Sequence, residues 1–169
     1  MNIRIGKANQ DHFSALRAIE LSSFETLLAA GAVTGKATAS SDEELQQYLD
    51  ADFLYAAFDE AAIPVGYGGG YIAENWLHIG EVDVHPSWQR KGIGRQIMNV
   101  MLNEGRTKKL RGSTLTTDRL APFNAPFYTS IGFHAIEGDA CPERLGAILA
   151  AEKTQGLDPL RRVAMMLVF

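Results

Sequence analysis

The chain has 169 residues and a formal net charge of −4, which suits one domain with a sizeable core and excludes the strongly basic balance of most nucleic-acid-binding proteins. Its 46% hydrophobic content is typical of globular proteins, no apolar run approaches a membrane span, and the first ten residues contain no apolar signal core. A single cysteine, Cys141, excludes an internal disulfide, so we expect a cytoplasmic protein with one domain over residues 1–169 and no nucleic-acid or membrane partner.

The first half of the chain is predicted to form a strand, two helices and three strands. These elements lie at residues 3–5, 13–24, 41–49, 53–58, 63–72 and 76–84, with a loop over 31–40. Ser41 and Glu44 have the spacing of a capping box at the start of the second helix. Four glycines in the strand over 63–72 indicate bulges or the close approach of another segment.

The second half is predicted to alternate helices and strands. The helices lie at residues 92–108, 124–131 and 142–155, and the strands at 115–117, 133–136 and 163–169. Gly132 is expected to end its helix as a left-handed cap. Early hairpins imply antiparallel pairing and the later alternation implies some parallel pairing, which predicts an α/β (α+β) fold with a mixed sheet. The basic residues of 105–112 are interpreted as cations at a helix C-terminus, with a phosphate contact as the alternative.

The sequence EVDVHPSWQRKGIGRQIM, residues 81–98, predicts an anion site. A strand ends at Pro86, and two glycines, Gly92 and Gly94, then stand at the N-terminus of a helix. The first N–H groups of a helix lack internal partners, and the helix dipole adds positive charge there. Glycines let a bulky phosphate approach these groups, and three basic side chains add formal charge. These cations are Arg90, Lys91 and Arg95.

The pattern around these glycines distinguishes between phosphate-binding motifs. A P-loop requires Ser or Thr after a Gly-Lys pair, and a dinucleotide fingerprint requires a third glycine where Ile97 stands. The pattern Q/R-x-x-G-x-G/A does fit, through Gln89, Gly92 and Gly94. On this motif the chain resembles the GNAT superfamily of acetyl-coenzyme A-dependent N-acetyltransferases, in which the loop holds the coenzyme pyrophosphate.

This resemblance implies a fold and a set of coenzyme-binding residues. The fold is a mostly antiparallel sheet of about seven strands flanked by helices, with a V-shaped cleft for the coenzyme. The oxyanion of the tetrahedral intermediate is expected to meet backbone N–H groups of a bulged strand around residues 82–84. The implied cofactor-binding residues are Val82, Asp83, Val84, Gln89, Arg90, Lys91, Gly92, Ile93, Gly94, Arg95 and Asn124.

A second segment, NAPFYTSIGF over residues 124–133, resembles the family's A-x-x-F-Y-x-x-x-G-F motif. Tyr128 matches a tyrosine that in many members protonates the departing thiolate; packing in the core beside Phe127 and Phe133 is the alternative. Many members also have an asparagine seven residues before this tyrosine, where the chain has Ala121. Asn124 is the candidate replacement. The NAPFY form and the closing RVAM sequence (162–165) resemble a subgroup of small bacterial members.

Three residues on the strand over 76–84 are candidates for the general base, and a mechanism without a dedicated base is the fourth alternative. Glu81 matches an acidic position of the family, and its pKa would rise among apolar neighbours. His78 needs no such shift, and Asp83 is the third candidate. Without a bulge, Glu81 and Asp83 would face away from His78. The remaining histidines have no metal-binding spacing, so no metal is expected.

We therefore expect an enzyme that transfers an acetyl group from acetyl-coenzyme A to a primary amine of a small molecule or peptide. The alternative is a sensor with the same fold that binds acyl-coenzyme A without turnover. Residues 20–41, which shape the acceptor site in the family, carry no charge pattern that identifies the acceptor. Homodimers are common in this family, so a second copy of the chain is an expected partner.

Overall fold

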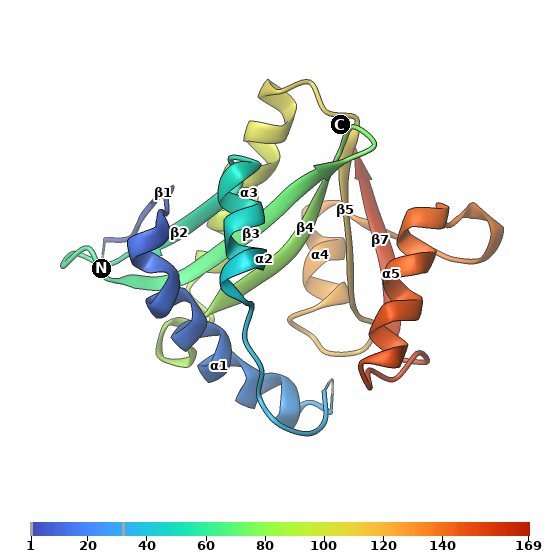
Figure 1. Cartoon of the computed structure of the whole chain (residues 1–169), viewed down its shortest axis with the longest axis horizontal. Helices are drawn as coiled ribbons and strands as arrows, with labels where there is room; N and C mark the ends of the chain where they lie inside the picture. The colour runs from blue at the N-terminus through green and yellow to red at the C-terminus, as the bar shows by residue number, and fades with distance from the viewer. Residues whose placement is uncertain (1, 32) are drawn as a thin grey trace.

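The computed structural model describes residues 2–31 and 33–169, so the expected loop over 31–40 is described except at position 32. Its centre is a sheet with strand order β1-β2-β3-β4-β5-β7-β6 (Figure 1). Only β4 and β5 pair in parallel among the described strands, so the expected mixed and mostly antiparallel sheet is confirmed. The strands are β1 (Arg4–Lys7), β2 (Leu54–Phe58), β3 (Pro64–Ala73), β4 (Trp76–Val84), β5 (Gly112–Asp118), β6 (His134–Ile136) and β7 (Arg162–Val168).

Five α-helices accompany the sheet in the described ranges, as the periodicity predicts. Ser41 accepts a hydrogen bond from the Glu44 N–H at 3.1 Å and so caps the second helix. Gly132 ends the fourth helix with φ +119°, the left-handed geometry expected there. The helices are α1 (Phe13–Ala29), α2 (Asp42–Asp50), α3 (Ile93–Thr107), α4 (Ala125–Ile131) and α5 (Glu143–Thr154).

The helices divide between the two faces of the sheet. On one face, α1 and α2 cover β2, β3 and β4, and α5 lies against β5 and β7 (Figure 1). On the other face, α3 and α4 pack on the larger core cluster, which includes Ile97, Met101 and Phe133. A Cβ at Gly68 would lie 2.6 Å from Ile97 Cγ2. The glycines of β3 therefore allow helices to approach the sheet closely on both sides.

The strands β4 and β5 pair over only two positions, Leu77 with Ser113 and His78 with Thr114. Beyond these positions the two strands diverge, and they leave a gap in the middle of the sheet. A bulge in β4 lies beside this gap, because Gly69 pairs with Glu81 whereas Gly70 pairs with Ile79. The extra residue is Gly80, so the expected bulge of this strand lies just before residues 82–84, whose N–H groups remain predicted oxyanion donors.

The bulge also changes which side chains share a face. Residues that pair directly across two strands point to the same face, so His78 follows Tyr71, and Asp83 follows Tyr67. The extra residue restores His78 to the face of Glu81 and Asp83, the face covered by α1, α2 and α5. The sequence predicts that His78 points away from Glu81 in a strand without a bulge. Because the strand has a bulge, the two side chains share a face.

None of the helices within residues 2–31 and 33–169 combines the length and apolar character needed to cross a membrane.

Close packing at Gly69 gives a test of the fold. A Cβ there would lie 2.7 Å from Tyr48 Cε2 and 2.8 Å from Cγ, and Tyr48 is buried. We expect Gly69→Ala to lower the free energy of unfolding by about 1–3 kcal/mol through overpacking. Gly146, inside α5, has no atom within 4 Å of an added Cβ, so Gly146→Ala should instead stabilise by about 0.5–1 kcal/mol. Urea unfolding measures both, and equal effects would contradict the packing described.

Candidate functional site

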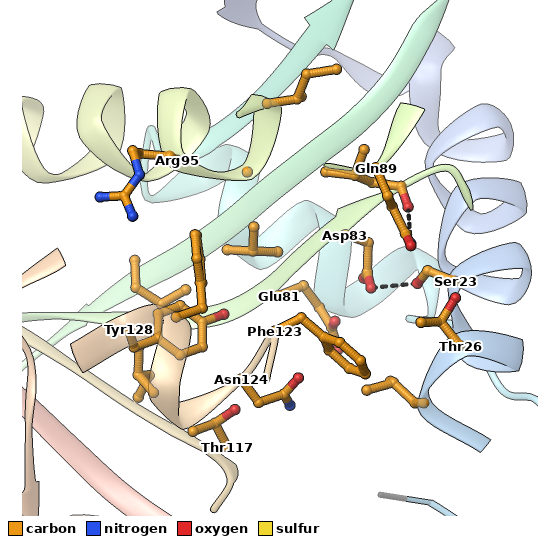
Figure 2. Close-up of a pocket in the computed structure, with 18 of the residues that line it drawn as sticks. Ser23, Thr26, Glu81, Asp83, Gln89, Arg95, Thr117, Phe123, Asn124 and Tyr128 are labelled. Atoms are coloured by element: carbon orange, nitrogen blue, oxygen red, sulfur yellow. Dashed lines mark hydrogen bonds between the residues drawn. The ribbon is translucent and has the colours of Figure 1, made fainter. Parts of the chain in front are cut away.

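A pocket of about 510 Å³ occupies the gap between β4 and β5 (Figure 2). It is lined by β4, the segment that leads into α3 and the N-terminus of that helix, β5, α4 with its preceding loop, α1, and Arg162 at the start of β7. Backbone groups of β4 beyond His78 have no ladder partner on β5. Because buried backbone groups require hydrogen-bond partners, this edge of β4 is suited to bind a ligand or ordered water.

One end of the pocket is the segment between β4 and α3, which we call the glycine loop (residues 85–94). Its direction is fixed by Gln89, whose Nε2 donates to the Val84 carbonyl at 2.9 Å. Gly92 has φ +79° and stands at the N-cap of α3, a backbone geometry that glycine adopts at low cost. The first N–H groups of α3 therefore open onto the pocket without helical partners. This geometry suits an anionic group.

Ten of the eleven predicted coenzyme-binding residues line this pocket. The exception is Lys91, whose Nζ lies 5.5 Å from the centre of the Trp88 ring. Ile93 contributes only its backbone, because its side chain is buried in the core. Arg95 donates to Ser130 Oγ at 2.7 Å, which holds α3 against α4. The ten lining residues are Val82, Asp83, Val84, Gln89, Arg90, Gly92, Ile93, Gly94, Arg95 and Asn124.

Tyr128 lies on the wall of the pocket opposite β4, as Figure 2 shows. Its ring packs edge-on against Phe127 and Phe133, with centroid separations of 5.1 and 5.9 Å. Burial raises the pKa of the Tyr128 hydroxyl above its usual value, and the negative charges of Asp83 and Glu81 raise it further. The hydroxyl therefore keeps its proton near neutral pH and is suited to donate it when a stronger base appears beside it.

Three carboxyl groups gather at the other side of the pocket, and we call them the carboxylate cluster: Glu20, Glu81 and Asp83. One oxygen from each lies within 4.8 Å of the others. Glu20 of α1 is fixed by the Tyr67 hydroxyl at 2.5 Å and by the Ser40 N–H at 2.9 Å. Oxygen ligands at this spacing suit a hard cation, and the same negative charge suits a protonated amine.

Glu81 and Asp83 form a coupled pair. Burial raises the pKa of both carboxyls, that of Asp83 to about 6, and the neighbouring charges raise that of Glu81 further. Asp83 Oδ1 accepts from Ser23 Oγ at 2.6 Å, whereas the buried Oδ2 lacks a donor. A proton bound by this pair would supply that donor and remove one negative charge. Together they can take up and release one proton near neutral pH.

His78 is not in this pocket, so the structure contradicts its candidacy as the general base. The ring is buried beneath Tyr71 and makes contact through Nδ1 with Thr114 at 3.0 Å and Arg144 at 3.3 Å. Burial lowers the pKa of His78 to about 4, and the charge of Arg144 adds to this shift. His78 therefore joins β4, β5 and α5 at the point where the two strands diverge, as a neutral packing residue.

The loop before α4 shows how Asn124 reaches the pocket. Ala121 is 2% exposed, and its N–H donates to Asp118 at 2.7 Å, so this position serves the loop rather than the pocket. Asn124 is the N-cap of α4, but its side chain makes no capping bond and lies in the pocket (Figure 2). That placement is consistent with Asn124 replacing the missing asparagine, whose role stays a prediction.

Several pocket residues could not be found from the sequence motifs. Ser23 and Thr26 come from α1, about 60 residues before Glu81, and Phe123 and Thr117 precede α4. Glu20 completes the carboxylate cluster from the same helix. The only sequence signal was the interruption of the apolar stripe of α1 by small polar residues, which does not by itself indicate a site.

Comparisons with known proteins agree on one fold. A family model described as an acetyltransferase (GNAT) domain matches residues 26–145. An acetyltransferase of the GNAT family from Staphylococcus aureus has 16% identity over 99% of both chains and a TM-score of 0.74. The ribosomal-protein-S18-alanine N-acetyltransferase from Escherichia coli has 15% identity over 99% of this chain and 94% of its own, with a TM-score of 0.69. PaiA N-acetyltransferase from Thermoplasma acidophilum, solved in complex with coenzyme A, has 15% identity over 100% of both chains and a TM-score of 0.67.

The raised pKa of Asp83 gives a pH test. The folded protein binds this proton more tightly than the unfolded chain, so the free energy of unfolding falls as pH rises through about 6. The free energy of unfolding of the unmodified protein should fall between pH 5 and pH 8. That of Asp83→Asn should fall by about 1 kcal/mol less over the same range. The lowered pKa of His78 acts in the opposite sense, but it is common to both proteins and cancels in the difference.

Urea unfolding at several pH values measures this difference. Asp139→Asn, which removes an exposed carboxyl outside the pocket, should retain the pH dependence of the unmodified protein. Parallel curves for all three proteins would show that Asp83 has no raised pKa.

Proposed function

Because the chain belongs to the GNAT acetyltransferase family, whose model matches residues 26–145, we propose that it transfers an acetyl group from acetyl-coenzyme A to a primary amine of a small molecule or peptide. The observation that carries this proposal is the pairing of two features in one pocket. A helix N-terminus with two glycines lies at one end, and the partly buried Tyr128 lies across from two neighbouring carboxyls, Glu81 and Asp83, at the other.

The glycine loop would hold the pyrophosphate of the coenzyme. The open N–H groups at the start of α3 would donate to phosphate oxygens, and Arg90 and Arg95 would add positive charge. Backbone groups of β4, which have no ladder partner on β5, would bind the extended arm of the coenzyme. The thioester would then lie between the Gly80 bulge and Tyr128, and a backbone N–H of β4 would stabilise the oxyanion.

The acceptor would approach from the face of α1 and α5, where the Glu81–Asp83 pair lies. An ammonium entering here would lose one proton to this pair and become a nucleophilic amine. Its nitrogen would attack the thioester carbon to form the C–N bond, and the C–S bond would break as the tetrahedral intermediate collapses. The second nitrogen proton would then replace the one that Tyr128 gives to sulfur, so the products are an amide, the free thiol and one released proton.

The raised pKa of Tyr128 keeps its hydroxyl protonated until the thiolate forms, but it also makes the phenol a weaker acid than a thiol, whose ordinary pKa is about 8.5. Proton transfer to sulfur would therefore be coupled to the return of the nitrogen proton to the phenol oxygen, with the three atoms held together. The edge-on contacts with Phe127 and Phe133 fix the ring, which leaves little freedom for the hydroxyl. Tyr128 would therefore donate its proton only to a sulfur atom that lies beside its hydroxyl.

Gly92 tests the coenzyme site. Gly92→Glu places bulk and negative charge at the N-terminus of α3, so coenzyme A affinity should fall at least tenfold, about 1.4 kcal/mol, in calorimetry. Gly92→Ala is the control, because it carries the same strain at φ +79° and has open space around its Cβ. Alanine should therefore weaken binding less than glutamate. Unchanged affinity in a folded Gly92→Glu protein would contradict the phosphate site.

Tyr128→Phe tests the chemistry, measured as thiol release from acetyl-coenzyme A over a panel of amines. The substitution keeps the ring contacts, so stability and coenzyme affinity should change little. Turnover should fall by about one to three decades, because the thiolate would leave without its acid. Near-normal turnover in the variant would remove this role. Tight coenzyme binding without thiol release from any amine would instead support a sensor of acyl-coenzyme A.

A further inference from the structure

The pocket is lined on one side by α1 and by the loop before α4. Leu27 of α1 and Phe123 of that loop both line the pocket here. Figure 2 shows Phe123 extending from its loop toward Thr26 of α1. The Phe123 side chain is 41% exposed although it is large and apolar. We call this side of the pocket the acceptor mouth and define it by Leu27 and Phe123.

Arg161 fixes the parts of the chain around the acceptor mouth. Its guanidinium donates to Asp118 at 2.8 and 3.1 Å and to the Ala30 carbonyl at 3.3 Å, just beyond α1. The Arg161 carbonyl accepts from the Arg119 N–H at 2.5 Å. Three segments far apart in the sequence are thereby joined: the end of α1, the start of the loop before α4 and the start of β7.

Each of these joined segments carries an exposed leucine. Leu160 is 82% exposed, Leu120 is 61% exposed and Leu28 is 46% exposed. Each lies within two residues of a bond that joins the segments. These three leucines do not line the pocket, so the apolar side chains that a ligand in the pocket would meet on this side are Leu27 and Phe123.

The charged side chains at this end of the pocket are already paired with one another. They therefore offer no partner to a ligand that carries a second charged group away from its amine. The three arginines of these segments are already paired, Arg161 with Asp118, Arg162 with Glu152 and Arg119 with Glu137. Glu152 makes two bonds of 3.1 Å to Arg162 and accepts from Thr116 at 2.6 Å. The unsatisfied charge lies deeper, at Glu81 and Asp83, where Asp83 Oδ2 is buried without a donor.

Resting on the function proposed above, we infer that the acceptor is a primary amine with an uncharged apolar body, such as an alkyl or aryl chain. Its ammonium group binds the Glu81–Asp83 pair, and its body lies against Leu27 and Phe123. Polyamines and amino sugars are disfavoured, because a second ammonium or a set of hydroxyls would meet apolar side chains in place of hydrogen-bonding partners.

The experiment titrates the coenzyme A-loaded protein with propylamine, hexylamine, 2-(2-aminoethoxy)ethanol and spermidine. Affinity should increase by about three- to fourfold for each methylene that is buried. Hexylamine should therefore bind much more tightly than its polar analogue 2-(2-aminoethoxy)ethanol or than spermidine. Phe123→Ser should reduce the difference between hexylamine and propylamine, and Ile63→Ser should leave it unchanged. Ile63 is 56% exposed, lies between β2 and β3, and does not line the pocket.

Each further outcome separates the acceptor class from acetyl transfer itself. Equal or tighter binding of the polar amines, or an undiminished chain-length effect in Phe123→Ser, overturns the apolar acceptor. A dimer in size-exclusion chromatography that Leu160→Ser dissociates also overturns it, because the apolar side chains would then belong to a second copy. Binding that increases with chain length but gives no thiol release from acetyl-coenzyme A supports the acceptor class and overturns the acetyltransferase proposal.

Discussion

The separation of β4 from β5 is the constraint on which the other features of the site depend. The two strands pair at only two positions, so the sheet contains a gap in its middle rather than at its edge. Side chains from both faces can reach this gap, with Tyr128 entering from the α3–α4 face and Glu81 and Asp83 belonging to the α1–α5 face. Backbone groups that would otherwise pair within the sheet remain available to a ligand.

Local charge at the site differs from the net charge of −4. Basic side chains and a helix N-terminus lie at the glycine loop, and three carboxyls lie toward α1. The positive and negative charges lie in different parts of the site, so one part can bind an anionic group and the other a cationic group. Burial moderates the negative charge at the second site, because the raised pKa values of Glu81 and Asp83 let this pair bind a proton that exposed carboxyls would lose.

Much of the fold was predictable from local sequence, because hydrophobic periodicity, the Ser41 cap and Gly132 each act within a few residues. The glycine loop and Tyr128 were found because their motifs are short and continuous. The position of the bulge was not predictable, since it depends on how the glycines of β3 meet β4. His78 was misplaced for that reason, and its burial by Arg144 depends on α5, 66 residues away. Ser23 and Phe123 enter the pocket, and Glu20 joins the carboxylate cluster, through tertiary packing alone.

The order of the last three strands in the sheet has a consequence for how the chain assembles. Within the described residues, β6 pairs only with β7, and β7 lies between β5 and β6. The sheet therefore cannot accept β6 until a later segment of the chain has inserted beside β5. The strand pairing of residues 134–136 therefore forms only once residues 162–168 are in place. Non-local pairing of this kind is slow, so β6 should join the sheet late in folding, whereas α4 can already contact α3 through Arg95 and Ser130.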